Sequence, residues 1–133
     1  MRLAGLSVLL GTILALAACG PGISRGGNLD NGRTIFNEGW NGRQSCASCH
    51  TLEAAGPQAV GKLGPNLDDA FRGAREQGFE ESTFQQVVRV QIAYPGIGLK
   101  MPADLVEGQA ADDVAYFVAH CSANTVDPAC KPQ

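Results

Sequence analysis

Cys46-Ala47-Ser48-Cys49-His50 is the stretch around which this 133-residue chain is organised. Its pattern, C-x-x-C-H, is the signature of covalent haem attachment. The two thiols can add to the two vinyl groups of one haem, and the small residues between them let the backbone lie close to the macrocycle. The histidine that follows brings an imidazole to one face of the iron. We therefore predict one haem c, bound through Cys46 and Cys49, with His50 as an axial iron ligand.

Two other kinds of site also use the C-x-x-C spacing. A thioredoxin-like redox pair is expected beside a βαβ pattern, and the sequence shows none. A zinc site needs a second pair of ligands, and Cys121 and Cys130 are too far apart to form another C-x-x-C. Neither alternative accounts for the histidine directly after the second cysteine. Haem attachment is therefore the favoured interpretation.

Residues 1–18 have the character of an export signal. Arg2 is followed by an uncharged, mostly apolar run that is shorter than the ~20 residues a membrane-spanning helix needs. Because a cysteine follows Ala17 and Ala18, the segment resembles a bacterial lipoprotein signal peptide. That resemblance implies that Cys19 becomes the lipidated N-terminus, anchored to a membrane without spanning it. The alternatives are a soluble protein cleaved after Ala18 and an uncleaved anchor.

Residues 19–29 contain glycine, proline and polar side chains with little apolar content, which predicts a flexible linker. Residues 30–133 are then long enough for one domain with a modest core, and a buried haem would add apolar surface to that core. The formal net charge is −3, and basic residues do not cluster. Nucleic-acid binding is therefore not expected.

The number of cysteines is odd, at five. If lipid takes Cys19 and haem takes two more, Cys121 and Cys130 remain. Exported proteins favour disulfides, and a bridge between these two would hold the C-terminal tail against the last helix. Two free thiols are the alternative.

Apolar spacing, capping residues and glycines predict four helices, at 30–38, at 68–76, from Ser82 onward and at 109–121. Gly32 and Phe36 share one face of the first helix. Because glycine weakens a helix, its presence on that face predicts that another helix approaches closely there.

The two longer helices carry the clearest patterns. The third begins with Ser82-Thr83-Phe84-Gln85, which fits a capping box. Its side chains expected to face the core are Phe84, Val87, Val88 and Ile92. The last helix has a buried stripe expected at Val114, Phe117, Val118 and Cys121, spaced i, i+3, i+4, i+7. His120 lies on its other side and is expected near the surface rather than as an iron ligand.

Two further residues complete the predicted site. Met101 follows an apolar, Gly- and Pro-containing loop, and a thioether is a soft ligand suited to haem iron opposite histidine. A metal-bound imidazole needs a hydrogen bond on its other nitrogen. We predict that the Pro65 carbonyl accepts that bond from Nδ1–H of His50. A simple turn before a helix is the alternative explanation of Gly64-Pro65-Asn66.

Together these features resemble a class I, single-haem bacterial cytochrome c over about residues 30–121. The residues that carry the likeness are Gly32, Phe36, Cys46-Ala47-Ser48-Cys49-His50, Gly64-Pro65-Asn66-Leu67, Lys100-Met101-Pro102, Val114 and Phe117. The resemblance implies an all-α cytochrome c fold, with about four short helices around one haem and the first and last helices crossing near a right angle. The C-terminal cysteine pair and the lack of a ring of lysines depart from the family pattern.

The resemblance also implies a function. We expect a membrane-tethered, monomeric electron carrier rather than an enzyme, working between a quinol-oxidising complex and a terminal oxidase or another haem-accepting complex. Its expected location is the bacterial cell envelope, at the outer face of the cytoplasmic membrane or on the periplasmic side. The alternatives are a fixed haem subunit of a larger membrane complex and a haem enzyme or gas sensor with a displaceable Met101. The apolar run at 97–99 disfavours the sensor.

Overall fold

The computed structural model describes residues 26–97 and 100–133. The predicted signal peptide, the lipidation site Cys19 and most of the predicted linker lie outside the described residues. Within the two described ranges, no helix is long and apolar enough to cross a membrane.

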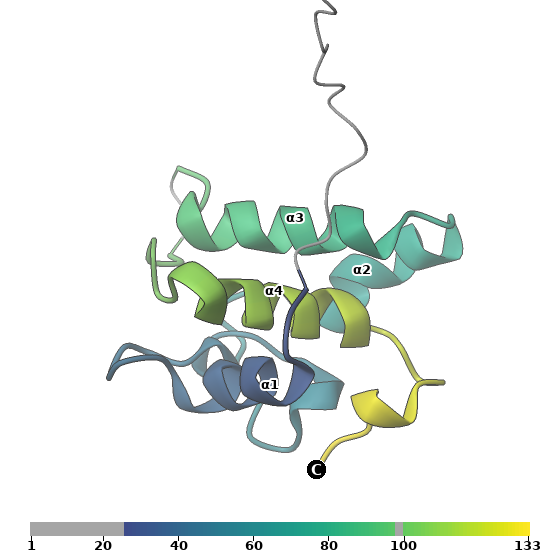
Figure 1. Cartoon of the computed structure of the whole chain (residues 1–133), viewed down its shortest axis with the longest axis horizontal. Helices are drawn as coiled ribbons and strands as arrows, with labels where there is room; N and C mark the ends of the chain where they lie inside the picture. Colours follow the sequence, from purple (N-terminus) through teal and green to yellow (C-terminus); the bar gives the residue numbers. More distant parts are fainter. Residues whose placement is uncertain (1–25, 98–99) are drawn as a thin grey trace, which may run out of the picture.

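Four α-helices form the described part of the chain: α1 (Leu29–Glu38), α2 (Leu67–Glu76), α3 (Glu81–Ala93) and α4 (Gly108–Cys121). The described residues also form three short 3-10 helices: η1 (Cys46–Ser48) and η2 (Glu53–Ala55) between α1 and α2, and η3 (Pro128–Cys130) after α4. The described residues form no strand, only an isolated bridge between Thr51 and Val60. The all-α prediction is confirmed. Figure 1 shows α4 between α1 and α3, and it packs against both.

The backbones of α1 and α4 approach closely at Gly32. A Cβ atom on this glycine would lie 2.7 Å from Cβ of Phe117 and would also meet the Asp113 carbonyl. Beside this point the rings of Phe36 and Phe117 meet edge to face, with centroids 5.9 Å apart. The predicted close approach of a second helix at Gly32 is confirmed, because no larger residue fits between the two backbones.

The fold begins earlier than the predicted boundary at residue 30. Asn28 caps α1 by accepting a hydrogen bond from N–H of Asn31 (2.9 Å), and its own N–H donates to Asp113 (3.0 Å). The carbonyl of Gly26 accepts a bond from Gln109. The last residues assigned to a flexible linker therefore belong to the domain. Their partners on α4 are more than 80 residues away in sequence, which local composition does not reveal.

Two expectations for α3 were wrong. The helix begins at Glu81 with Glu80 as its N-cap and no capping side-chain bond, so Ser82 lies inside the first turn and forms no capping box. Val87 is 54% exposed, whereas Phe84, Gln85 and Ile92 are buried. The helical period was right, but the buried face includes the polar residue Gln85, and Arg89 of α3 pairs with Asp112 of α4 at 2.7 Å.

The predicted stripe on α4 is confirmed. Its four members, Val114, Phe117, Val118 and Cys121, are each at most 2% exposed. They form the centre of one apolar core together with Phe36 of α1 and Ile92 of α3.

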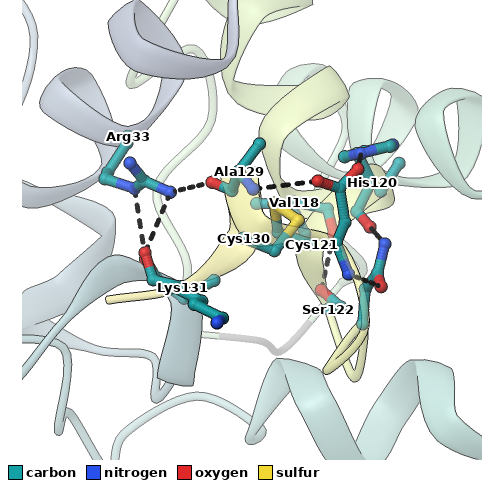
Figure 2. The surroundings of a disulfide bond; sticks show 12 residues. Arg33, Val118, His120, Cys121, Ser122, Ala129, Cys130 and Lys131 are labelled. Carbon is teal, nitrogen blue, oxygen red and sulfur yellow. Dashed lines mark hydrogen bonds and ion pairs between the residues drawn. A yellow bond between two sulfur atoms is a disulfide. The ribbon is translucent and has the colours of Figure 1, made fainter. Parts of the chain in front are cut away.

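The C-terminal tail is fastened to this core. The structure contains a disulfide between Cys121 and Cys130, whose Cα atoms lie 5.0 Å apart. Figure 2 shows Arg33 of α1 on one side of the disulfide, donating to the carbonyls of Ala129 (2.5 Å) and Lys131 (3.5 Å). The guanidinium also donates to Ala54 of η2. A buried arginine thus satisfies carbonyls of two segments that would otherwise lack partners.

Candidate haem site

The C-x-x-C-H motif forms a single tight turn. N–H groups of Cys49 and His50 both donate to the carbonyl of Cys46, at 3.0 and 2.9 Å. Ala47 faces inward and is 4% exposed, while both cysteines are partly buried and are not bonded to each other. The turn therefore presents two free thiols and one imidazole from five consecutive residues.

The chemistry of these thiols disfavours the two alternative sites. Burial raises the pKa of the Cys46 thiol to about 11, whereas redox-active C-x-x-C pairs depend on a lowered thiol pKa. Among the described residues, no three His, Cys, Asp or Glu side chains lie close enough together to hold a metal ion. Cys121 and Cys130 are joined to each other, so they do not supply the second ligand pair of a zinc site.

His50 is held in one orientation by its surroundings. Its Nδ1 lies 2.9 Å from the carbonyl oxygen of Pro65, as the sequence predicted. With the proton on Nδ1 donated to that oxygen, the lone pair of Nε2 is left for a metal. A backbone carbonyl of proline is a suitable partner because its φ is fixed by the ring.

Two glycines, Gly61 and Gly64, allow the loop after the motif to pack closely against it. A Cβ atom on Gly64 would lie 2.6 Å from Nδ1 of His50, and one on Gly61 would lie 2.5 Å from the backbone nitrogen of Cys49. N–H of Gly64 also donates to the Cys49 carbonyl at 2.8 Å. The sequence alone assigned Gly61 no role and placed Gly64 only in the segment that contains Pro65. Their three-residue spacing directly before the Pro65 acceptor was the signal that could have identified them.

The turn explanation of Gly64-Pro65-Asn66 is also correct. Asn66 caps α2 by accepting hydrogen bonds from N–H of Asp68 (2.9 Å) and Asp69 (3.3 Å). The two interpretations are compatible, because Pro65 offers its carbonyl to His50 while the next residue starts the helix.

Met101 lies between α3 and α4. It is partly buried and packs against the same apolar core as Cys46. The segment that follows it is tied to the segment that enters the haem motif, because Arg43 donates to the carbonyl of Asp104 and to Glu107 (2.6 Å). Residues 98–99 of the predicted apolar loop lie outside the described residues. Ligation of iron by Met101 stays a prediction.

His120 is occupied by other partners. Its Nδ1 lies 3.0 Å from Glu81 and its Nε2 lies 2.8 Å from Asp127, and its ring stacks on Tyr116. Burial lowers the pKa of this imidazole, but the hydrogen bonds and charges of Asp127 and Glu81 outweigh burial and raise it. Because both ring nitrogens are engaged, His120 is not a candidate iron ligand.

The surroundings of the motif fit a haem. Gly64 lies directly against the His50 ring, where no side chain would fit, so the loop holds the imidazole in place. Val60 and Leu63, which adjoin Gly61 and Gly64 in the sequence, are 61% and 69% exposed, so apolar side chains are available beside the motif to contact a haem. Covalent haem attachment requires two free thiols and an oriented imidazole, with apolar side chains nearby, and this site offers all three.

A helical fold built around C-x-x-C-H defines a class of protein, and the chain belongs to the c-type cytochromes. No protein-family model matches the sequence. Among solved structures, the chain is similar to the c-type cytochrome SorU from Sinorhizobium meliloti. The two are 32% identical, the match covers 71% of this chain and 91% of that chain, and the TM-score is 0.53. The fold is accordingly that of cytochrome c, and membership of this family implies covalently bound haem c.

Proposed function

We propose that this c-type cytochrome carries one electron at a time, with His50 and Met101 as the two axial ligands of a single haem. The observation that carries the proposal is the orientation of His50. Its Nδ1 is bonded to the Pro65 carbonyl and its ring is packed against Gly64, so Nε2 is prepared to bind iron.

The haem, when bound, supplies the Fe(II)/Fe(III) couple. The residues of this chain supply the rest. Cys46 and Cys49 of the η1 turn would hold the haem through thioether bonds, and the Pro65 carbonyl sets the tautomer and basicity of His50. A thioether from Met101 opposite an imidazole favours the reduced state and raises the reduction potential. If His50 and Met101 both hold the iron, no ligand position would remain for a substrate, so the proposed role is transfer rather than catalysis.

The proposal includes a membrane tether and redox partners. A lipid on Cys19 would hold the domain at the outer face of the cytoplasmic membrane or on the periplasmic side, through residues 20–25. Confinement to one surface raises the effective concentration of partners. We expect a quinol-oxidising complex as the electron donor and a terminal oxidase or another haem-accepting complex as the acceptor.

Replacement of the predicted ligand tests the proposal. The protein made with haem maturation should show a low-spin ferric spectrum with a Met–iron charge-transfer band. Met101→Ala should lose that band and lower the reduction potential. Leu105→Ala is the matched control, because Leu105 packs against the same core four residues later and has no ligating atom. A band that persists in Met101→Ala would show that another group binds the iron.

A further inference from the structure

Arg43 makes an unusual set of contacts for a surface residue. It lies three residues before Cys46, in the segment that leads from α1 into the haem motif. Its guanidinium donates to the backbone carbonyl of Asp104 and to the carboxylate of Glu107 (2.6 Å), and it lies 5.2 Å from the centre of the Trp40 ring. The bond to Asp104 spans 61 residues of sequence.

Asp104, the residue that receives this bond, is itself held in a special conformation. Its φ is +52°, a left-handed value that few non-glycine residues adopt. Its N–H donates to the carbonyl of Ile92 in the last turn of α3, at 3.0 Å. The backbone of Asp104 is therefore fixed on one side by α3 and on the other by Arg43.

The fixed residue lies close to the proposed sulfur ligand. Met101 precedes Asp104 by three residues, and Pro102 between them restricts the backbone. Two residues after Asp104, Val106 is 2% exposed and anchors the segment in the core. A displacement of Asp104 would therefore be passed to Met101 rather than absorbed further along the chain.

We propose that Arg43 is a positioning residue for the Met101 thioether, holding the segment that carries the sulfur against the segment that enters the haem motif. The inference rests on the proposed ligation by Met101. The ion pair between Arg43 and Glu107 contributes little to this restraint, because the two side chains are 43% and 51% exposed and solvent screens their charges. The bond to the Asp104 carbonyl, with the guanidinium held against Trp40, is the contact that acts on the backbone.

Exogenous imidazole measures this restraint. Imidazole binds the ferric iron when Met101 has left it, so its apparent affinity reports how often the segment opens. Arg43→Leu should bind imidazole about tenfold more tightly than the unaltered protein, because a hydrogen bond to a charged group is lost. Glu107→Gln, which leaves the bond to Asp104, should bind less than about threefold more tightly. Arg43→Lys should lie between these variants.

Two controls separate this role from general stability. Arg72→Leu removes another exposed pair, with Asp69 at 3.4 Å, on α2 and should leave imidazole affinity unchanged. Asp112→Asn weakens the ion pair between α3 and α4, and should lower the urea midpoint without the tenfold change in affinity.

The outcomes separate two errors. If the unaltered protein shows the Met–iron band and Arg43→Leu binds imidazole like Arg72→Leu, the positioning role is overturned while the ligation stands. If the unaltered protein lacks the band, the ligation is wrong and the positioning role is overturned with it.

Discussion

Replacing Gly64 by alanine places a methyl group against the ring of His50. The added carbon would lie 2.4 Å from Cε1 and 2.6 Å from Nδ1, whereas ordinary van der Waals contact begins at 3.4 Å, so the two groups must separate by about 1.0 Å. The ring cannot make this shift and keep its 2.9 Å bond to the Pro65 carbonyl. Crowding of this kind costs about 1–3 kcal/mol, and the lost hydrogen bond adds about 1 kcal/mol.

We therefore expect Gly64→Ala to reduce the free energy of unfolding by about 2–4 kcal/mol, measured by urea denaturation of the protein with haem attached. The same variant should show a mixture of spin states in the ferric spectrum, because His50 no longer approaches the iron correctly. A loss of stability without a spectral change would mean that the glycine serves the loop and not the ligand.

Gly73→Ala is the control for this substitution. Gly73 lies within α2 and a Cβ atom there meets nothing within 4 Å. Alanine is the better helix former by about 0.5–1 kcal/mol, so this variant should be slightly more stable with an unchanged spectrum. If Gly64→Ala matches Gly73→Ala in both measurements, the packing argument at His50 is refuted.

Two predictions concern the C-terminal tail. The pKa of His120 in the fold is raised above its ordinary value of 6.5, so the stability that its charged form contributes is complete below pH 6.5 and is lost as the pH rises through the raised pKa. The urea midpoint should therefore fall over that pH range. His120→Gln should remove this part of the fall. A steeper fall in His120→Gln would contradict the assignment. Replacing Cys121 and Cys130 by serine together should cost about 2–3 kcal/mol of unfolding free energy, seen as a lower urea midpoint with an unchanged haem spectrum. A changed spectrum would mean that the tail supports the haem site directly.

Local patterns predicted the parts of this fold that depend on neighbouring residues. The haem motif is five consecutive residues, and the buried stripe of α4 repeats at helical spacing. Gly32 could be assigned to a helix crossing because a glycine in a helix needs a reason. In each case the physical requirement is visible within one or two turns of chain.

Contacts between distant segments were not predictable in this way. The buried face of α3 includes Gln85, and its Arg89 pairs with Asp112 of α4, whereas pattern analysis assigns polar residues to the outside. The roles of Gly61 and Gly64 depend on a loop that folds back on the motif. The restraint on Asp104 by Arg43 crosses 61 residues. These features depend on how distant segments pack together, and the local sequence around each residue is compatible with more than one structural role.

The absorption spectrum of the ferric protein, purified with its haem attached, tests the central claim most directly. With His50 and Met101 on the iron, the spectrum should be low-spin and show the Met–iron charge-transfer band, and the ferrous form should not bind carbon monoxide tightly. A high-spin ferric spectrum, or tight carbon monoxide binding without displacement of methionine, would contradict the proposed closed coordination and the role of electron carrier.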